Sequence, residues 1–179
     1  MLKKLLISLA VIVVVFLVVV ALQPKEFRVA RSTTISAAPS AVFAQVNDFH
    51  KWAAWNPWGK IDPAMKKTYE GAQSGVGAIY NWAGNNEVGE GRMTIVESRP
   101  SDLIRVKLEF FKPFAGTSTA EFTFKPAGNQ TMVTWNMFGE NNFMAKAIHL
   151  FMNMDKMIGD QFEKGLADMK AVVEGGSKS

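Results

Sequence analysis

The chain begins with a long uncharged run. After two lysines, residues 5–22 carry no charge. At ~1.5 Å per residue, a helix of this length nearly covers the ~30 Å hydrocarbon layer of a bilayer. It is also longer than the ~7–15 apolar residues of a cleaved signal peptide. The run predicts a transmembrane anchor over residues 1–24. The alternatives are a removed signal peptide, with Val19 and Ala21 as an imperfect cleavage site, and a buried helix of a soluble protein.

Charges on the two sides of this run hardly distinguish its orientation. Lys3 and Lys4 precede it, and Lys25, Arg28 and Arg31 follow it, so the preference of basic flanks for the cytoplasm favours neither side strongly. Because the tail before the run is short, we expect it to stay in the cytoplasm. The rest would then be exported from a single-pass position in the cell membrane, into the periplasm if the cell is a Gram-negative bacterium.

The next segment changes from strand-like to helix-like spacing. Residues 26–35 alternate in polarity and are rich in β-branched side chains, which predicts a first strand. From Pro39, which suits a first helical turn, the spacing becomes helical. The apolar positions on one side of this short helix are Val42, Phe43, Val46 and Phe49. One or two further turns over HKWAAW are expected to end at Pro57.

From Lys66 onward, short alternating segments are separated by residues that favour tight reversals. They are MKKTYEG, GAIYNWAG, EGRMTIVES, DLIRVKLEFF, TSTAEFTFKP and TMVTWNMFG. In the fourth segment the apolar residues occupy one face and the charged residues the other, which predicts one buried and one solvated face. The pattern is typical of a six-strand antiparallel meander.

Residues 142–174 have the spacing of one long amphipathic helix, with Asn142 as its cap and Gly175 and Gly176 as stop signals. Such a helix would run ~45–50 Å, enough to cross the face of a sheet. His149 falls on its polar side, which predicts a solvated imidazole. Residues 25–175 would form one domain, and residues 176–179 a disordered tail.

Composition narrows the classes of function. The net charge is +4, but the basic residues are scattered, without the clustered stripe that nucleic-acid binding needs. The chain has no cysteine, which excludes disulfides, thiolate catalysis and cysteine-ligated metals. Neither nucleic acid nor a cofactor is expected as a partner.

The order of these elements resembles the helix-grip fold of the START and Bet v 1-like (SRPBCC) superfamily. Within it, several motifs are similar to the polyketide cyclase/dehydrase family over about residues 27–173: Pro39-Ser-Ala-Val-Phe, Asn47-Asp-Phe, Trp52, Trp55, Pro57 and Trp58, Val76-Gly-Ala-Ile-Tyr-Asn-Trp, Gly89-Glu-Gly-Arg-Met-Thr-Ile, and Thr131-Met-Val-Thr-Trp. The resemblance implies an α+β domain in which a curved antiparallel sheet grips the last helix around an apolar cavity. It also implies binding of lipids, sterols or polyketides, with catalysis in a minority of members. No motif allows a catalytic role to be transferred position by position.

Three tryptophans in NDFHKWAAWNPWG are a second pointer to function. Trp52 and Trp55 share one side of a helical turn, and Trp58 is expected in the loop beyond Pro57. Large indoles with one polar N–H favour the border between core and water. The cluster is open to three interpretations: packing of the short helices on the sheet, a lid over a cavity, or contact with the membrane interface.

Candidate catalytic groups are sparse. His50 and His149 are the only imidazoles, and no metal-binding or nucleophile motif is present. His50 is expected on the surface or in a cap, and Glu121 on the solvated face of its strand. Asp155 lies at the flank of the apolar sector of the last helix, where its carboxylate would point either into the cavity margin or into water.

The sequence therefore predicts a membrane-anchored domain that binds or carries a hydrophobic small molecule, without catalysis and without a metal. The expected ligand-binding residues are Trp52, Trp55, Tyr80, Trp82, Phe110, Phe122, Trp135, Phe151 and Ile158. Two alternatives remain. One is a cyclase or dehydratase that uses inward polar groups such as Asn81, Asn136 or Asp155. The other is a membrane-tethered protein-interaction module with a filled core.

Overall fold

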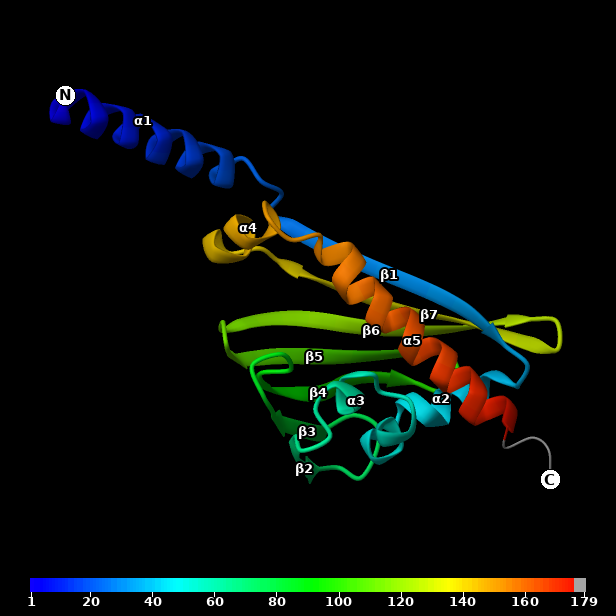
Figure 1. Ribbon diagram of the computed structural model, residues 1–179. Coiled ribbons are helices and arrows are strands. Elements are labelled where there is room, and N and C mark those ends of the chain that lie inside the picture. The colour runs from blue at the N-terminus through cyan, green and yellow to red at the C-terminus, as the bar shows by residue number, and fades with distance from the viewer. Residues whose placement is uncertain (176–179) are drawn as a thin grey trace.

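The computed structural model describes residues 1–175 (Figure 1). The elements, in chain order, are α1 (Leu2–Ala21), β1 (Glu26–Ile35), α2 (Pro39–Val46), the 3-10 helix η1 (Phe49–Ala54), α3 (Trp58–Ile61), β2 (Lys66–Gly71), β3 (Ala78–Ala83), β4 (Glu90–Arg99), β5 (Leu103–Lys112), β6 (Gly116–Ala127), β7 (Gln130–Glu140), α4 (Phe143–His149) and α5 (Met154–Gly175). The predicted tail, residues 176–179, lies outside the described residues.

The strands form one seven-stranded antiparallel sheet in the order β1-β7-β6-β5-β4-β3-β2. Strands β2 to β7 are a meander, and β1 joins its end by pairing with β7, from Glu26 opposite Glu140 to Ile35 opposite Thr131. Helix α5 crosses one face of the sheet (Figure 1). The predicted α+β helix-grip fold is therefore confirmed.

The two faces of the sheet differ as the alternation in β5 predicts. Ile104 and Val106 are buried on the inner face. On the outer face, Arg105 donates hydrogen bonds to Glu97 and Glu121 of the neighbouring strands. Opposite charges on adjacent strands stabilise such a solvated face, while the inner face has to be covered by helices.

The C-terminal amphipathic region is two helices, which corrects the prediction of one helix over residues 142–174. Asn142 caps α4 by accepting a hydrogen bond from the Ala145 amide at 2.8 Å. Asn153 does the same for the Lys156 amide at 2.9 Å. Helix α4 ends at His149. Because an N-cap residue has a non-helical backbone, Asn153 starts a separate helix, α5, and does not continue α4. Gly175 is the last residue of α5 instead of its stop signal.

The short helices after β1 complete the core. Trp52 and Trp55 are buried, and their indole N–H groups donate to the backbone carbonyls of Val46 and Gln45 at 2.9 and 3.2 Å. These bonds satisfy the one polar atom of each side chain. Both indoles therefore pack the short helices on the sheet. A lid over a cavity is compatible with this packing and stays a prediction. Trp58 begins the short helix α3, where a loop was predicted.

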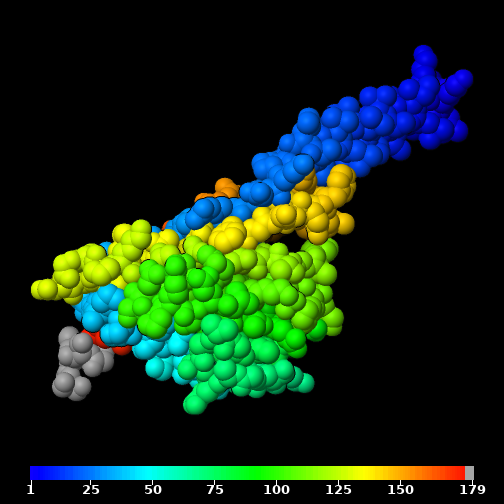
Figure 2. Space-filling view, turned by 180° about the vertical axis from the view of Figure 1, so that it is seen from behind, coloured from blue at the N-terminus to red at the C-terminus, as the bar shows by residue number. Residues whose placement is uncertain are grey.

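Helix α1 stands away from the sheet (Figures 1 and 2). Val20, near its end, is its one buried residue. Among the residues that the structure describes, α1 is the single helix long and apolar enough to cross a membrane. It fits either a single-pass anchor or a signal peptide, since both have these properties.

Candidate functional site

A cavity of about 360 Å³ lies between the inner face of the sheet and the N-terminal part of α5. Its walls come from nearly every element of the domain, and most of the lining side chains are apolar. Opposite the helices, β6 contributes only small residues, Gly116, Thr117, Ser118 and Ala120, which leave space that larger side chains would fill. A cavity of this volume falls in the range of about 300–1,000 Å³ that is usual for small-molecule sites.

The sheet side of the cavity is held by aromatic packing. Trp82 lies across Gly91 of the neighbouring strand, where a Cβ would collide with the indole ring and with the Glu109 carbonyl. The indole N–H of Trp82 donates to the Val88 carbonyl at 3.1 Å, and its ring meets Phe110 edge to face with centroids 5.8 Å apart. Gly91 is therefore required for the position of this wall.

The inner end of the cavity is closed by a stack of rings. Trp135 of β7 stacks on Phe162 of α5, with ring centroids 4.1 Å apart and an interplanar angle of 10°. It also stacks on Phe122 of β6 at 4.9 Å. On the helix side, Gly165 leaves room for the indole, because a Cβ there would lie 2.9 Å from Cζ3 of Trp135. Beyond these rings the space between α5 and the sheet is filled.

The other end of the cavity is closed by α4 and by the start of β1. Ala145, Ile148 and His149 line it from α4, and Phe27 lines it from β1. The imidazole of His149 meets the Phe27 ring edge to face, with centroids 6.2 Å apart. The prediction of a solvated His149 was therefore wrong: the break after α4 turns this residue inward. Burial lowers the pKa of His149 and favours its neutral form.

Polar groups in the cavity are few and suited to binding. Asn56, Thr117, Ser118, Asn141 and Asn142 contribute uncharged side chains, and Glu140 contributes one carboxyl group. Burial raises the pKa of Tyr80, so its hydroxyl stays protonated. Within residues 1–175, no group of three or more His, Cys, Asp or Glu side chains is arranged to hold a metal ion. The site can enclose an apolar molecule and offer it a small number of hydrogen bonds.

The structure brings together six of the nine predicted ligand-binding residues. Those that line the cavity are Trp52, Tyr80, Trp82, Phe110, Trp135 and Ile158. Trp55 and Phe122 are buried against the ring of Trp135 and do not line the cavity. Phe151 is 79% exposed and stacks on Phe16 of α1, because the helix break carries it away from the sheet. Ligand contact by the six lining residues stays a prediction.

The polar residues considered for catalysis do not line the cavity. Asn81 bonds to Thr68, Glu70 and Arg92 on the outer face of the sheet. Asn136 accepts a hydrogen bond from Arg28, also on the outer face.

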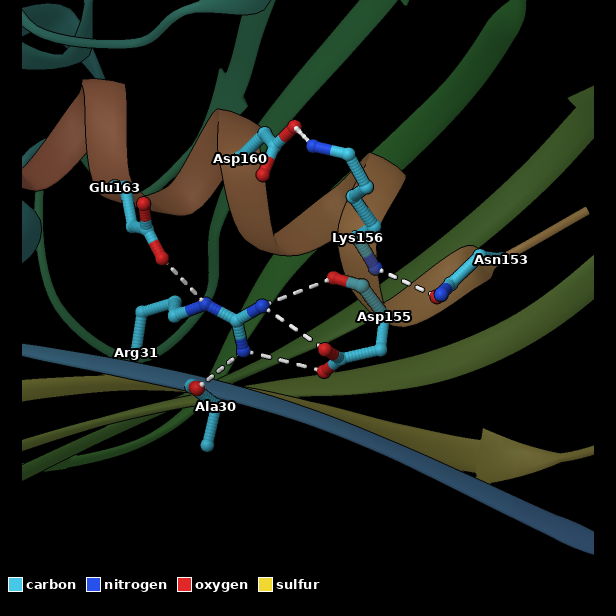
Figure 3. A network of polar contacts seen from close by, with 7 residues as sticks. All are labelled: Ala30, Arg31, Asn153, Asp155, Lys156, Asp160 and Glu163. Atoms are coloured by element: carbon cyan, nitrogen blue, oxygen red, sulfur yellow. Dashed lines mark hydrogen bonds and ion pairs between the residues drawn. The ribbon is translucent and has the colours of Figure 1, made fainter.

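Asp155, the third such residue, belongs to an ion-pair cluster at the start of α5 (Figure 3). Arg31 of β1 donates to the Asp155 carboxylate at 3.0 and 3.1 Å, and to Glu163 at 2.8 Å. The hydrogen bond from Arg31 lowers the pKa of Asp155. A Cβ at Gly159 would collide with the guanidinium group, so this glycine lets β1 and α5 approach. The cluster fastens α5 to the sheet outside the cavity.

Several lining residues were missed from the sequence. Met93 and Leu108 alternate with polar residues on their strands, and Met137 follows Trp135 at the same spacing of two. The strand period alone could therefore have identified them. Met144 and Ile148 of α4 could not be identified in this way. Their orientation depends on the break between α4 and α5, which the helical pattern conceals.

Solved structures with similar folds extend over most of the chain. A protein of Chromobacterium violaceum shares 17% identity with a TM-score of 0.58, covering 84% of this chain and 99% of its own. The major latex-like protein 151 of Panax ginseng shares 13% identity with a TM-score of 0.56, covering 83% and 98%. The di-domain ARO/CYC StfQ from the steffimycin biosynthetic pathway shares 11% identity with a TM-score of 0.61, covering 87% of this chain and 53% of its own. At these identities the similarity shows the fold alone.

No curated protein matches the sequence. A family match, in contrast, spans residues 26–174, which is the whole of the sheet and the helices that cover it. The motifs of the sequence, the seven-stranded sheet around α5 and this match agree. The chain belongs to the family described as polyketide cyclase / dehydrase and lipid transport.

Proposed function

We propose that this protein binds or carries a hydrophobic small molecule, lipid-like or polyketide-like, in the cavity between its sheet and α5, without converting it. Residues 1–24 would be a retained single-pass anchor, and residues 25–175 the binding domain on the extracytoplasmic side. The observation that carries the proposal is the apolar cavity of about 360 Å³. The family and the fold support binding of a hydrophobic ligand in general.

Burial of the ligand is sufficient as a binding mechanism. Removing one methylene from water contributes ~0.8 kcal/mol, so about ten methylenes contribute ~8 kcal/mol, which offsets the lower half of the ~4–15 kcal/mol that association costs in lost motion. Few polar groups are needed for this. The anchor would hold the cavity beside a bilayer from which such a ligand can be drawn.

The position of the polar groups favours binding over turnover. Asn81 and Asn136 face outward, and Asp155 is paired with Arg31. The cavity itself weighs against a protein-interaction module, for which we expected a filled core. A cyclase or dehydratase would have to use the polar groups of the lining, which are Asn56, Tyr80, Thr117, Ser118, Glu140, Asn141, Asn142 and His149.

The test is native mass spectrometry of the full chain purified in nanodiscs and loaded with fatty acid or sterol. We expect one bound molecule of unchanged mass. Ala120 is buried on the cavity wall, so Ala120→Phe should abolish loading by occupying the space. Ala30→Phe is the matched control, because Ala30 is exposed on β1 and does not line the cavity.

Three outcomes would contradict the proposal. No loading with any apolar probe would remove the binding function. Equal loading of the two phenylalanine variants would place the ligand elsewhere. A loaded compound whose mass changes during incubation would favour the enzyme.

A further inference from the structure

The α4 segment, residues 143–152, exposes an unusual amount of apolar surface. Four large apolar side chains within these ten residues are exposed: Phe143 by 51%, Met144 by 53%, Phe151 by 79% and Met152 by 45%. Single exposed apolar residues are normal on soluble domains, but a contiguous group marks a surface that meets a partner or a membrane.

The α4 segment lies beside the end of α1 (Figure 2). Phe151 stacks on Phe16 with centroids 6.4 Å apart, and the Lys146 ammonium donates to the Ala21 carbonyl at 3.2 Å. Phe16 precedes Ala21 by five residues, which at ~1.5 Å per residue places Phe151 ~7–8 Å along α1 from its last residue. Helices that lie in a membrane interface bury their apolar face to a depth of ~5–10 Å. The apolar side chain of Phe151 is therefore at the depth of an interfacial segment.

The opposite side of the α4 segment faces the cavity. A groove beside the end of α1 is lined by Pro24, Leu150 and Phe151, among others. Four residues line both the groove and the cavity: Phe27, Asn141, His149 and Met154. We call these four residues the partition. The partition borders both hollows, and His149 is its member on α4, so a movement of α4 would displace this part of it.

The α4 segment is held more weakly than its neighbours. Helix α4 has seven residues, and every one of them, all within the described part of the chain, is at least partly exposed. Isolated helices of this length are marginal in water. Helix α5, in contrast, is fastened to β1 by Arg31. The structure therefore combines a fixed wall with a loosely held one at the α1 end of the cavity.

We propose that the α4 segment inserts into the lipid leaflet next to α1 and forms the passage through which the ligand moves between bilayer and cavity across the partition. The occupant of the exposed apolar surface is the bilayer, because the surface is continuous with α1 and lies at interfacial depth along it. This proposal rests on the proposed function, since it needs α1 as a retained anchor.

Insertion is tested by single-cysteine labelling, which the absence of cysteine in the natural chain makes direct. The full chain with Phe151→Cys, carrying an NBD fluorophore, is reconstituted into phosphatidylcholine vesicles. Val96→Cys is the control, since Val96 is 47% exposed on β4, far along the sheet from α1. We expect blue-shifted emission and quenching by doxyl-labelled phosphatidylcholine at position 151 only.

Two results would overturn the insertion, and they are distinguishable. If alkaline carbonate releases the chain from the vesicles, the retained anchor of the proposed function fails, and with it this inference, while binding in the cavity is decided by the loading experiment. If the chain resists carbonate but the label at position 151 emits as in water, the inference alone fails.

The passage is tested by the rate at which a pyrene-labelled fatty acid leaves donor vesicles for the reconstituted protein. Phe151→Lys should slow this transfer about tenfold or more, because a charge opposes burial of the α4 segment in lipid. Phe151 is outside the cavity, so the amount bound at equilibrium should not change. Val96→Lys should transfer at the wild-type rate. Equal rates for both variants would overturn the passage.

Discussion

The space between the sheet and its helices is filled at one end and hollow at the other. Toward the C-terminal end of α5, Leu166 and Met169 are buried against the sheet, with Phe124 on the strand side. Toward the N-terminal end, Met154 and Ile158 border a cavity. The stack of Trp135 on Phe162 separates the two ends.

The difference lies in what covers the sheet. At the filled end, α2 supplies Val42 and Val46, which are buried over the sheet together with α5. At the hollow end, the short helix α4 takes the place of α2 beside α5, and the strand side carries Ser118 and Ala120. The same inner face thus provides stability where α2 and α5 fill the space over it. It provides a binding space where α5 is accompanied by the short helix α4.

Truncation on the two halves of α5 should show this difference most strongly. Leu166→Ala is expected to lower the free energy of unfolding by ~2–5 kcal/mol, because it opens a void in a filled core. Ile158→Ala, on the same helix, should cost less than half as much, since its side chain already borders empty space. Urea unfolding followed by tryptophan fluorescence in detergent measures both. Equal losses would mean that the hollow end is packed as tightly as the filled one.

Adding one methyl group to the filled end should have the next largest effect. At Gly165 a Cβ would lie 2.9 Å from Cζ3 of Trp135 and 3.1 Å from Cδ of Pro57. Gly165→Ala should therefore cost ~1–3 kcal/mol through overpacking. At Gly175, on the same helix, a Cβ meets nothing within 4 Å, so Gly175→Ala should leave the unfolding midpoint unchanged or slightly raised. A higher midpoint for Gly165→Ala would contradict the tight contact.

A larger addition at the hollow end should be tolerated. Ala120→Phe places a ring where the cavity is, so the free energy of unfolding should change by no more than about 1 kcal/mol in either direction. The same unfolding assay applies. A loss as large as that of Gly165→Ala would show that the wall around Ala120 cannot accept the ring, and the loading experiment would then need a smaller substitution such as Ala120→Leu.

Lowering the pH should reduce the stability of the fold slightly, through His149 at the hollow end. Burial lowers the pKa of His149 from its ordinary value of 6.5, so the folded chain binds this proton less readily than the unfolded chain. Stability should therefore be unaffected by this group above about pH 6.5 and decrease as the pH falls below it. The charged groups of the adjoining groove are Glu26, Arg28 and Asp155, and the hydrogen bond from Arg31 keeps Asp155 ionised in this range.

His149→Phe isolates the contribution of this imidazole. The variant keeps a ring against Phe27 but cannot be protonated, so its unfolding midpoint should fall less than that of the natural chain between pH 7 and pH 5. Parallel curves for the two proteins would assign the pH dependence to other groups.

The sequence predicted the sheet better than the helices that cover it. Alternation in segments such as residues 103–110 predicted the strands and their buried face, because each side chain of a strand points opposite to the next whatever lies around it. The aromatic residues of the strands were placed on the cavity side for the same reason. The helical cover was predicted less well, since Phe151, His149 and Asp155 all depend on a break between two helices whose joined pattern is amphipathic throughout.

By itself the sequence determined the apolar first helix, the seven strands and which face of each is buried, since these follow from composition and from periods of about 2 and 3.6 residues. Only the tertiary structure decided that α4 leaves the path of α5, that His149 turns inward, and that the space over Ala120 stays empty while the space over Phe124 is filled. These outcomes depend on contacts between residues far apart in the chain, such as Arg31 with Asp155 and Phe16 with Phe151. Local periodicity carries no information about such contacts.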